Sequence, residues 1–326
     1  MKKNSTKIMF FITLILGTLL TMNSNNWLSM WMGMEINLIA FIPLIINFKN
    51  NSSDSAMMYF IIQSMGSIIM LTSVLMTSMM YQKTFMAMMI IISMSIKMGL
   101  APFHMWIPML MEKMSWLNNI ILMTWQKLAP MTVMSFMMNK LIIILAMMST
   151  IIGAIGGINQ TSTRMIMAYS SISHSGWMTS TISMDNELWM MYMMLYSMIL
   201  IMIVMYMNMY SIKFINQINI NMNINQKIQY SIMMMSMGGL PPFLGFLPKW
   251  MVIQVMIYNN MFMMMVIMIM MTLITLFFYI RMLSPLMLFN QHCMKWDMKK
   301  YKMNFISIIM MVMNMSLPLM MIINFN

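Results

Sequence analysis

Eleven long apolar runs set the main limit on what this sequence can fold into. Most of them have the roughly 20 residues that a helix needs to cross a bilayer. Only 7% of the 326 residues are charged, whereas soluble domains carry about a quarter. The sequence therefore predicts an all-α polytopic membrane protein of about eleven transmembrane helices, with a single domain over residues 1–326. The runs lie at about 8–22, 27–46, 56–81, 85–111, 116–138, 141–158, 165–183, 188–210, 229–258, 261–283 and 304–323.

The basic residues support this number of helices. When the polar segments are assigned alternately to two sides, thirteen Lys and Arg residues fall on the side of the N-terminus and two, Lys83 and Lys140, on the other. Lys97, Lys127 and Lys249 are left out because they lie within runs. Positive loops collect on the side of synthesis, and a miscounted helix would scramble the asymmetry. We therefore expect the N-terminus to face the compartment of synthesis and the C-terminus to face away.

Two of the runs contain helix breakers. In the fourth run, Gly99 and Pro102 follow Lys97, and in the ninth run the stretch GGLPPFLGFLPKW places three prolines just ahead of Lys249. Each proline removes a backbone donor and clashes with the preceding turn. Unpaired backbone at membrane depth survives only when it is buried in protein or lines a hydrated cavity. We therefore predict two broken helices with functional groups beside the breaks.

The positions of these two breaks indicate an internal repeat. They lie five helices apart, and because five is odd, the second set of five helices would enter the membrane upside down. This is the pattern of an inverted repeat in transporters. We expect repeat halves at about 1–138 and 141–283, followed by a C-terminal helix at 304–323.

Lys127 is the most deeply placed charge. Roughly ten residues of its run lie on either side, so that about 15 Å separate it from each membrane face. A lysine side chain cannot span that distance to reach the headgroups. A buried lysine costs about 2.5–3.5 kcal/mol on insertion scales. We interpret Lys127 as a group that accepts and releases protons, with structural anchoring as the alternative.

Two further ionisable residues, Glu35 and Lys97, lie within the second and fourth runs. A buried acid and a buried amine offset each other's desolvation, and breaking the pair leaves one charge uncompensated. We expect Glu35 to pair with Lys97, so that forming and breaking the pair acts as a switch. The alternative is a carboxylate that is protonated in lipid or paired only for structure.

The histidines and the last lysine complete the candidate site. His104 lies seven residues after Lys97, roughly 10 Å along an unbroken helix, which suits a bridge of waters. A polar histidine satisfied at a helix break is the alternative. His174 lies among serines in MAYSSISHSGWMTST and is interpreted as a proton relay, since imidazole can accept at one nitrogen and donate at the other. Interhelical hydrogen bonding is its alternative. Lys249 directly follows Pro248, and a lysine that snorkels to the interface is the rival interpretation.

Several classes of protein are excluded. A single cysteine, Cys293, leaves no disulfide framework, iron–sulfur cluster or cysteine zinc site within the chain. No G-x-G-x-x-G motif after a strand, Walker lysine loop or H-E-x-x-H motif is present. The net charge of +12 comes from lysines in short loops rather than from a basic stripe, so we expect no nucleic-acid binding. The 67 methionines suggest an A+T-rich organellar gene in which an isoleucine codon is read as methionine.

Five stretches carry a resemblance to a known family. In order along the chain they are WMGMEINLIAFIP, KMGLAPFHMWIPML, MTWQKLAP, IGGINQTSTRMIMAYSSISHSGWM and GGLPPFLGFLPKW. They resemble the subunit 2 family of mitochondrial NADH–ubiquinone oxidoreductase, respiratory complex I. The likeness runs from about residue 25 to 285 and is weak in the tail.

This resemblance implies an antiporter-like subunit in the membrane arm of complex I. It implies a proton-translocation path built from the charge pair Glu35 and Lys97, the central lysine Lys127, the connecting residue His174 and the terminal lysine Lys249. His104 matches the histidine after the broken fourth helix. It also implies a multi-pass protein of the mitochondrial inner membrane, with the N-terminus on the matrix side and the C-terminus on the intermembrane-space side.

The resemblance also bears on cofactors and partners. No cofactor or metal is expected in this chain, because NADH, FMN, the iron–sulfur clusters and ubiquinone are handled by other subunits of the complex. The expected partners are neighbouring antiporter-like subunits, accessory subunits and membrane lipid. A stand-alone cation/proton antiporter subunit and a purely structural membrane-arm subunit remain as alternative functions.

Overall fold

The structure, a computed structural model, describes residues 2–46, 52–77, 83–137, 139–184, 187–219 and 224–288. Within these residues the regular secondary structure is helical, with one isolated antiparallel bridge between Ser162 and Phe214. The all-α prediction is therefore confirmed for the described part of the chain. The C-terminal helix predicted at 304–323 and Cys293 lie outside the described residues.

The helices follow the predicted apolar runs closely. They are α1 (Lys2–Asn23), α2 (Trp27–Ile45), α3 (Ser52–Thr77), α4 (Lys83–Met98), α5 (Trp106–Lys113), α6 (Trp116–Met123), α7 (Trp125–Ser135), α8 (Lys140–Gly157), α9 (Thr163–Ile182), α10 (Leu188–Met209), the 3-10 helix η1 (Ile215–Asn219), α11 (Ile224–Gly238), α12 (Phe246–Tyr258) and α13 (Phe262–Leu288).

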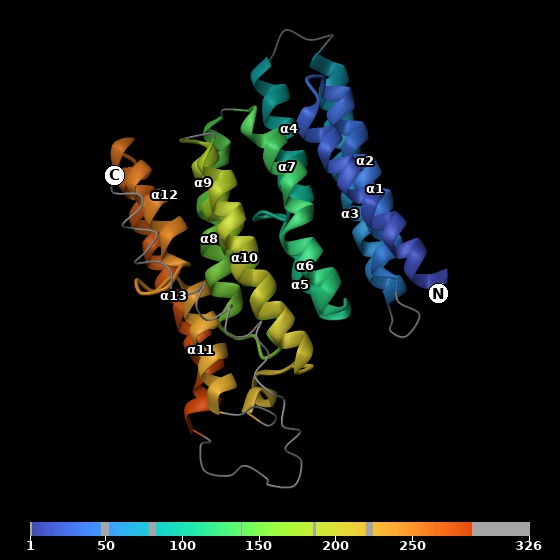
Figure 1. Cartoon of the computed structure of the whole chain (residues 1–326). Helices are drawn as coiled ribbons and strands as arrows, with labels where there is room; N and C mark the ends of the chain where they lie inside the picture. Colours follow the sequence, from blue (N-terminus) through green and yellow to red (C-terminus); the bar gives the residue numbers. More distant parts are fainter. Residues whose placement is uncertain are drawn as a thin grey trace.

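The helices form one bundle with their axes roughly aligned (Figure 1). Helices α1 to α3 lie at one edge, α8 and α9 near the middle, and α12 and α13 at the other edge. Six of the described helices are long and apolar enough to cross a membrane, namely α1, α2, α3, α8, α10 and α13. The run at 165–183 forms the single helix α9, and the other runs within the described residues are each divided into two shorter helices, α4 and α5, α6 and α7, and α11 and α12.

The two predicted breaks have the same local structure. Helix α4 ends before Gly99 (φ +67°) and α11 ends before Gly239 (φ +79°), and both glycines adopt the left-handed region. In each break, the glycine amide bonds to the carbonyl three residues back, and the amide of the following leucine, Leu100 or Leu240, bonds to the carbonyl five residues back. This pattern is the Schellman motif, which satisfies carbonyls at a helix end.

The sequence of the two breaks also repeats. The pattern Gly-Leu-x-Pro-Phe occupies residues 99–103 and again residues 239–243. The glycine supplies the left-handed conformation, and the proline prevents the helix from continuing. Two helices far apart in the chain therefore end by the same means.

A third interruption divides the fifth run, which the sequence analysis did not predict. Helix α6 ends at Met123 and α7 begins at Trp125, with Thr124 between them at φ −111° and ψ −74°. Pro130 lies within α7 and cannot donate to the carbonyl of Gln126. This proline was the available signal.

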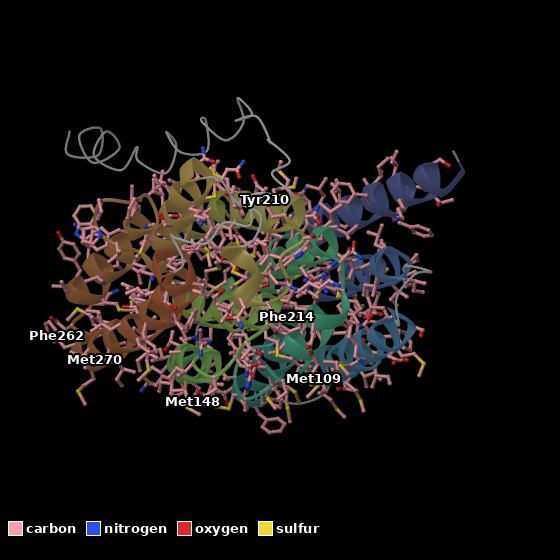
Figure 2. All side chains as sticks on the ribbon, turned by 90° about the horizontal axis from the view of Figure 1, so that it is seen from below. Met109, Met148, Tyr210, Phe214, Phe262 and Met270 are labelled. Carbon is pink, nitrogen blue, oxygen red and sulfur yellow. The ribbon has the colours of Figure 1, made fainter. Side chains whose placement is uncertain are left out.

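The surface of the bundle is apolar, as expected for a protein in lipid. Met109, Met148, Phe262 and Met270 lie on the periphery (Figure 2), and their side chains are 41–56% exposed. Lys97, Lys127 and other ionisable side chains are instead buried. The surface is therefore as apolar as the core, and the buried ionisable residues lie away from lipid.

Helix α9 is the central element that positions the site. Almost all of its residues from Ile166 to Ile182 are buried, although many are serine or threonine. Its Ser170, Ser171 and Ser173 hydroxyls each donate to the carbonyl three residues back, which satisfies them within the helix. Helices α8 and α9 pack so closely that a side chain at Gly153 would clash with the backbone of Ser173. Gly153 and Gly157 form a G-x-x-x-G motif on α8, and at Gly153 it lets the two helices pack closely.

Candidate functional site

The predicted pair of Glu35 and Lys97 is present in the structure. The Nζ atom of Lys97, in the last turn of α4, lies 3.7 Å from Oε1 of Glu35 in the middle of α2. The lysine side chain is 3% exposed, whereas the glutamate side chain is 25% exposed. The alkyl chain of Lys97 packs on Gly66 of α3, and the amide of Gln63 donates to the Lys97 carbonyl at 3.0 Å. Three helices therefore hold this pair.

His104 lies in the segment between α4 and α5. Its Nδ1 atom is 3.2 Å from the carbonyl oxygen of Pro102, and the residue is 9% exposed. The break at Gly99 separates His104 from Lys97, so that the two residues do not share the face of one continuous helix. The local contact agrees with the alternative interpretation, a polar histidine satisfied at a helix break.

Lys127 lies at the centre of the bundle on α7 and is 2% exposed. Its ammonium donates to the carbonyl oxygen of Ser171 in α9 at 2.7 Å and lies 5.8 Å from the centre of the Tyr196 ring. Within the described part of the chain, the ion pairs are Lys97 with Glu35 and Lys113 with Asp54. Lys127 therefore has neutral contacts rather than a carboxylate in that part of the chain.

His174 lies one turn along α9 from the carbonyl that Lys127 contacts. Its Nδ1 atom is 2.9 Å from the hydroxyl of Tyr192, and the imidazole lies close to the backbone of Met237. Its ring also stacks obliquely on Tyr196, with 4.9 Å between the ring centres. Both Lys127 and Lys249 lie near enough to act on it electrostatically.

Lys249 lies near the start of α12 and is buried in the bundle. It is 6% exposed, and its ammonium donates to the carbonyl oxygen of Gly238 at 2.7 Å. That carbonyl belongs to the last residue of α11, so the lysine folds back onto the break. This inward contact favours the interpretation of Lys249 as a buried group over that of a lysine that snorkels to the interface. His174 and Lys249 contact consecutive backbone residues, Met237 and Gly238.

A small cavity lies between His174 and Lys249. Its volume is about 10 Å³, which is near the space that one water molecule occupies. Polar groups on the wall come from α8, α9, α12 and α13, so a water there would find several partners. The lining residues are Thr150, Ser173, His174, Trp177, Lys249, Met271, Thr272 and Thr275.

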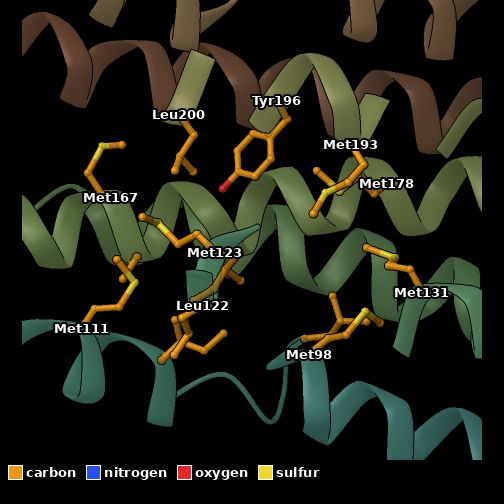
Figure 3. Packing of buried hydrophobic residues seen from close by; sticks show 14 of the residues in the cluster. Met98, Met111, Leu122, Met123, Met131, Met167, Met178, Met193, Tyr196 and Leu200 are labelled. Carbon is orange, nitrogen blue, oxygen red and sulfur yellow. The ribbon is translucent and has the colours of Figure 1, made fainter. Parts of the chain in front are cut away.

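Tyrosines of α10 were missed by the sequence analysis. Tyr192 and Tyr196 are four residues apart on one helix face, and both contact His174. Figure 3 shows Tyr196 among the buried methionines, near Met123 and Leu200. The sequence signal that could have found them was the spacing of four residues between two tyrosines within one apolar run.

The ionisable residues of the described chain do not form a metal site. No group of three His, Cys, Asp or Glu residues gathers in the part that the structure describes. The arrangement instead brings amines, an imidazole and backbone carbonyls into sequence across the bundle. An amine or an imidazole can take up and release a proton, whereas the backbone carbonyls act only as hydrogen-bond acceptors.

Comparisons with known proteins place this geometry in context. A family model described as NADH:quinone oxidoreductase/Mrp antiporter, TM matches residues 24–275. Two similar proteins, from Locusta migratoria and Anopheles gambiae, are named NADH-ubiquinone oxidoreductase chain 2. The locust protein is 41% identical, over 93% of this chain and 92% of its own length. The mosquito protein is 42% identical, over 96% of this chain and 95% of its own length.

Solved structures share the fold at low sequence identity. A chain of respiratory complex I from Thermus thermophilus with bound aureothin superposes with a TM-score of 0.78 at 16% identity, covering 86% of this chain and 70% of its own. A chain of the Mrp complex from Dietzia sp. DQ12-45-1b gives a TM-score of 0.77 at 13% identity, covering 85% of this chain and 59% of its own. These matches establish a common architecture.

Proposed function

The chain belongs to the NADH:quinone oxidoreductase/Mrp antiporter membrane family, and from this premise we propose that it is a proton-translocating subunit of NADH:ubiquinone oxidoreductase. Relatives about 41% identical over nearly their whole length are named as chain 2 of that enzyme, which supports this assignment within the family. Its place is the membrane arm of respiratory complex I in the mitochondrial inner membrane. It takes part in an enzyme without carrying the redox chemistry.

The observation that carries the proposal is the environment of Lys127. A lysine that is 2% exposed sits on the carbonyl oxygen of Ser171 and beside a tyrosine ring. A residue with only a structural role would have a lower desolvation cost if it were neutral or paired with an opposite charge, because burial penalises an unpaired charge. A buried amine without a carboxylate partner is instead suited to gaining and losing a proton during turnover.

The proposed mechanism begins at the Glu35–Lys97 pair. Electron transfer elsewhere in the complex changes the electrostatic field along the membrane arm and alters this pairing. The change shifts the proton affinity of Lys127, which passes its proton by way of His174 to Lys249. The contacts of His174 with Tyr192 and with the backbone of Met237 support a fixed orientation for the relay.

The work of moving a proton across the membrane potential and the free energy of a pKa change at an amine are of similar size. Moving one elementary charge across 100 mV costs about 2.3 kcal/mol. A change of one to two units in the pKa of an amine is worth about 1.4 kcal/mol per unit. A modest electrostatic change at each step is therefore of the right order to drive the proton against the membrane potential.

The architecture that we propose has eleven transmembrane crossings and an inverted repeat, with halves at about 1–138 and 141–283. The repeated Gly-Leu-x-Pro-Phe break supports the repeat. The N-terminus faces the matrix and the C-terminus the intermembrane space. Thiol labelling of cysteines introduced at Asn25 and Gln160 checks this orientation, since Asn25 should be reached from the intermembrane space and Gln160 from the matrix. Labelling of both from the same face would contradict it.

The proposal also covers partners and cofactors. Neighbouring antiporter-like subunits and accessory subunits contact the chain, and lipid covers its apolar periphery. NADH, FMN, iron–sulfur clusters and ubiquinone belong to other subunits of the complex.

Substitution of Lys127 by methionine tests the proposal. The variant keeps the length of the side chain, so the complex should assemble, but proton pumping in membrane vesicles should fall at least tenfold, because a general acid–base group typically contributes about 10²-fold or more. Normal pumping by an assembled Lys127→Met complex would leave only a structural role. Co-purification without any NADH-oxidising subunit would instead favour a stand-alone antiporter.

A further inference from the structure

Gln126, the residue before Lys127, joins three helices through its side-chain amide. Its Nε2 atom donates to Oδ1 of Asn37 in α2 at 2.8 Å, and its Oε1 atom accepts from the hydroxyl of Tyr59 in α3 at 3.2 Å. Asn37 and Tyr59 are 4% and 2% exposed. Hydrogen bonds between buried groups are costly to lose, because the partners left behind cannot turn to water.

These bonds lead back to the charge pair. Asn37 lies two residues from Glu35 on α2, and Tyr59 lies one turn from Gln63 on α3. Gln63 bonds to the carbonyl of Lys97. The contacts therefore form a closed ring through four helices. The ring runs from Glu35 on α2 to the first turn of α7, then to α3, and returns by way of Lys97 on α4.

The break at Thr124 bears on how this ring of contacts holds Lys127. Helix α7 begins at Trp125, so that its first turn does not continue the hydrogen-bonded ladder of α6. Lys127 lies within this turn, and its amide makes a 3.3 Å bond to the carbonyl of Thr124. The bonds of Gln126 to α2 and α3 therefore help to fix where the turn, and the ammonium it carries, is held.

We infer that Gln126 is a positioning residue, which holds Lys127 in register with the Glu35–Lys97 pair through Asn37 and Tyr59. The inference rests on the proposed function and deepens it. A change at the charge pair reaches Lys127 both through the electrostatic field and through displacement of these hydrogen-bonded helices.

The test uses the assembled complex in membranes. Gln126→Met keeps the side-chain volume but removes both hydrogen bonds, and Tyr59→Phe removes one of them. We expect abundance of the complex to be retained, coupled turnover to fall about threefold to tenfold for Gln126→Met and by less for Tyr59→Phe, and the pH profile of turnover to shift. An exchanged pair, Gln126→Asn with Asn37→Gln, restores the total reach of the bridge and should recover turnover relative to Gln126→Asn alone.

A matched control is Asn119→Leu, which removes another buried amide. Asn119 donates to the carbonyl of Met111 at 3.0 Å and has no part in the ring. The inference is overturned if Gln126→Met behaves as this control does, with an unchanged pH profile, while Lys127→Met abolishes pumping. Normal pumping by Lys127→Met would refute the proposed function itself, so the two failures are distinguishable.

Discussion

At the scale of single residues, the buried amines of this protein divide into two kinds. Lys97 has a carboxylate partner 3.7 Å away, whereas Lys127 and Lys249 donate to the backbone carbonyls of Ser171 and Gly238. A carbonyl accepts the hydrogen bond of an ammonium without neutralising its charge. The free energy of protonating Lys127 or Lys249 is therefore sensitive to nearby charge, as a proton relay requires.

Tyr192→Phe tests how His174 is held. The change removes the hydroxyl 2.9 Å from the Nδ1 atom but leaves the ring, so we expect coupled turnover to fall about twofold to tenfold with little loss of assembled complex. The matched control is Tyr206→Phe on the same helix, whose hydroxyl donates to the carbonyl of Gln226. Equal effects of the two changes on turnover would contradict a specific role for Tyr192.

The sequence was sufficient to identify the ionisable residues and the partner of Lys97, but not the contacts of Lys127 and His174. The depth of Lys127 in its apolar run follows from counting residues, and the pairing of Glu35 with Lys97 follows from the cost of burying each alone. The carbonyl contact of Lys127 and the tyrosines around His174 depend on how α7, α9 and α10 pack. Packing between distant segments leaves no local pattern in the sequence.

At the scale of elements, the broken helices position two of the buried lysines. The C-terminal end of α11 presents its last carbonyl to Lys249, and the break between α6 and α7 sets the start of the turn that carries Lys127. The breaks at Gly99 and Gly239 could be predicted because proline and glycine act locally. The break at Thr124 could not be predicted with equal ease, since its nearest breaker, Pro130, lies six residues away.

Gly239→Ala tests the break in the ninth run. At φ +79° an alanine is strained by about 1 kcal/mol, and its Cβ atom would lie 2.9 Å from the Nζ and Cδ atoms of Lys249. We expect reduced abundance of the complex and, in the complex that assembles, reduced pumping. The neighbouring change Gly238→Ala is the control, because its Cβ atom would meet Leu276 at an ordinary 3.4 Å. Pumping lost equally in both variants would speak against the account.

At the scale of the whole molecule, the fold places an apolar surface around an interior that packs buried polar and ionisable groups within an apolar core. Exposed side chains such as Met270 face outward, while α9 carries serines, threonines and His174 through the centre. Lys127 on α7 and Lys249 on α12 lie on two different helices that both pack against α9. The number of apolar runs and the positions of the breaks predict this plan, but the central place of α9 is visible only in the folded chain.

The most direct test of the proton path is an experimental density map of the assembled complex in which ordered waters are visible. We predict waters that connect Lys97, Lys127, His174 and Lys249, with one in the cavity between His174 and Lys249. Dry apolar packing between these side chains, or side chains turned toward the lipid, would contradict the account.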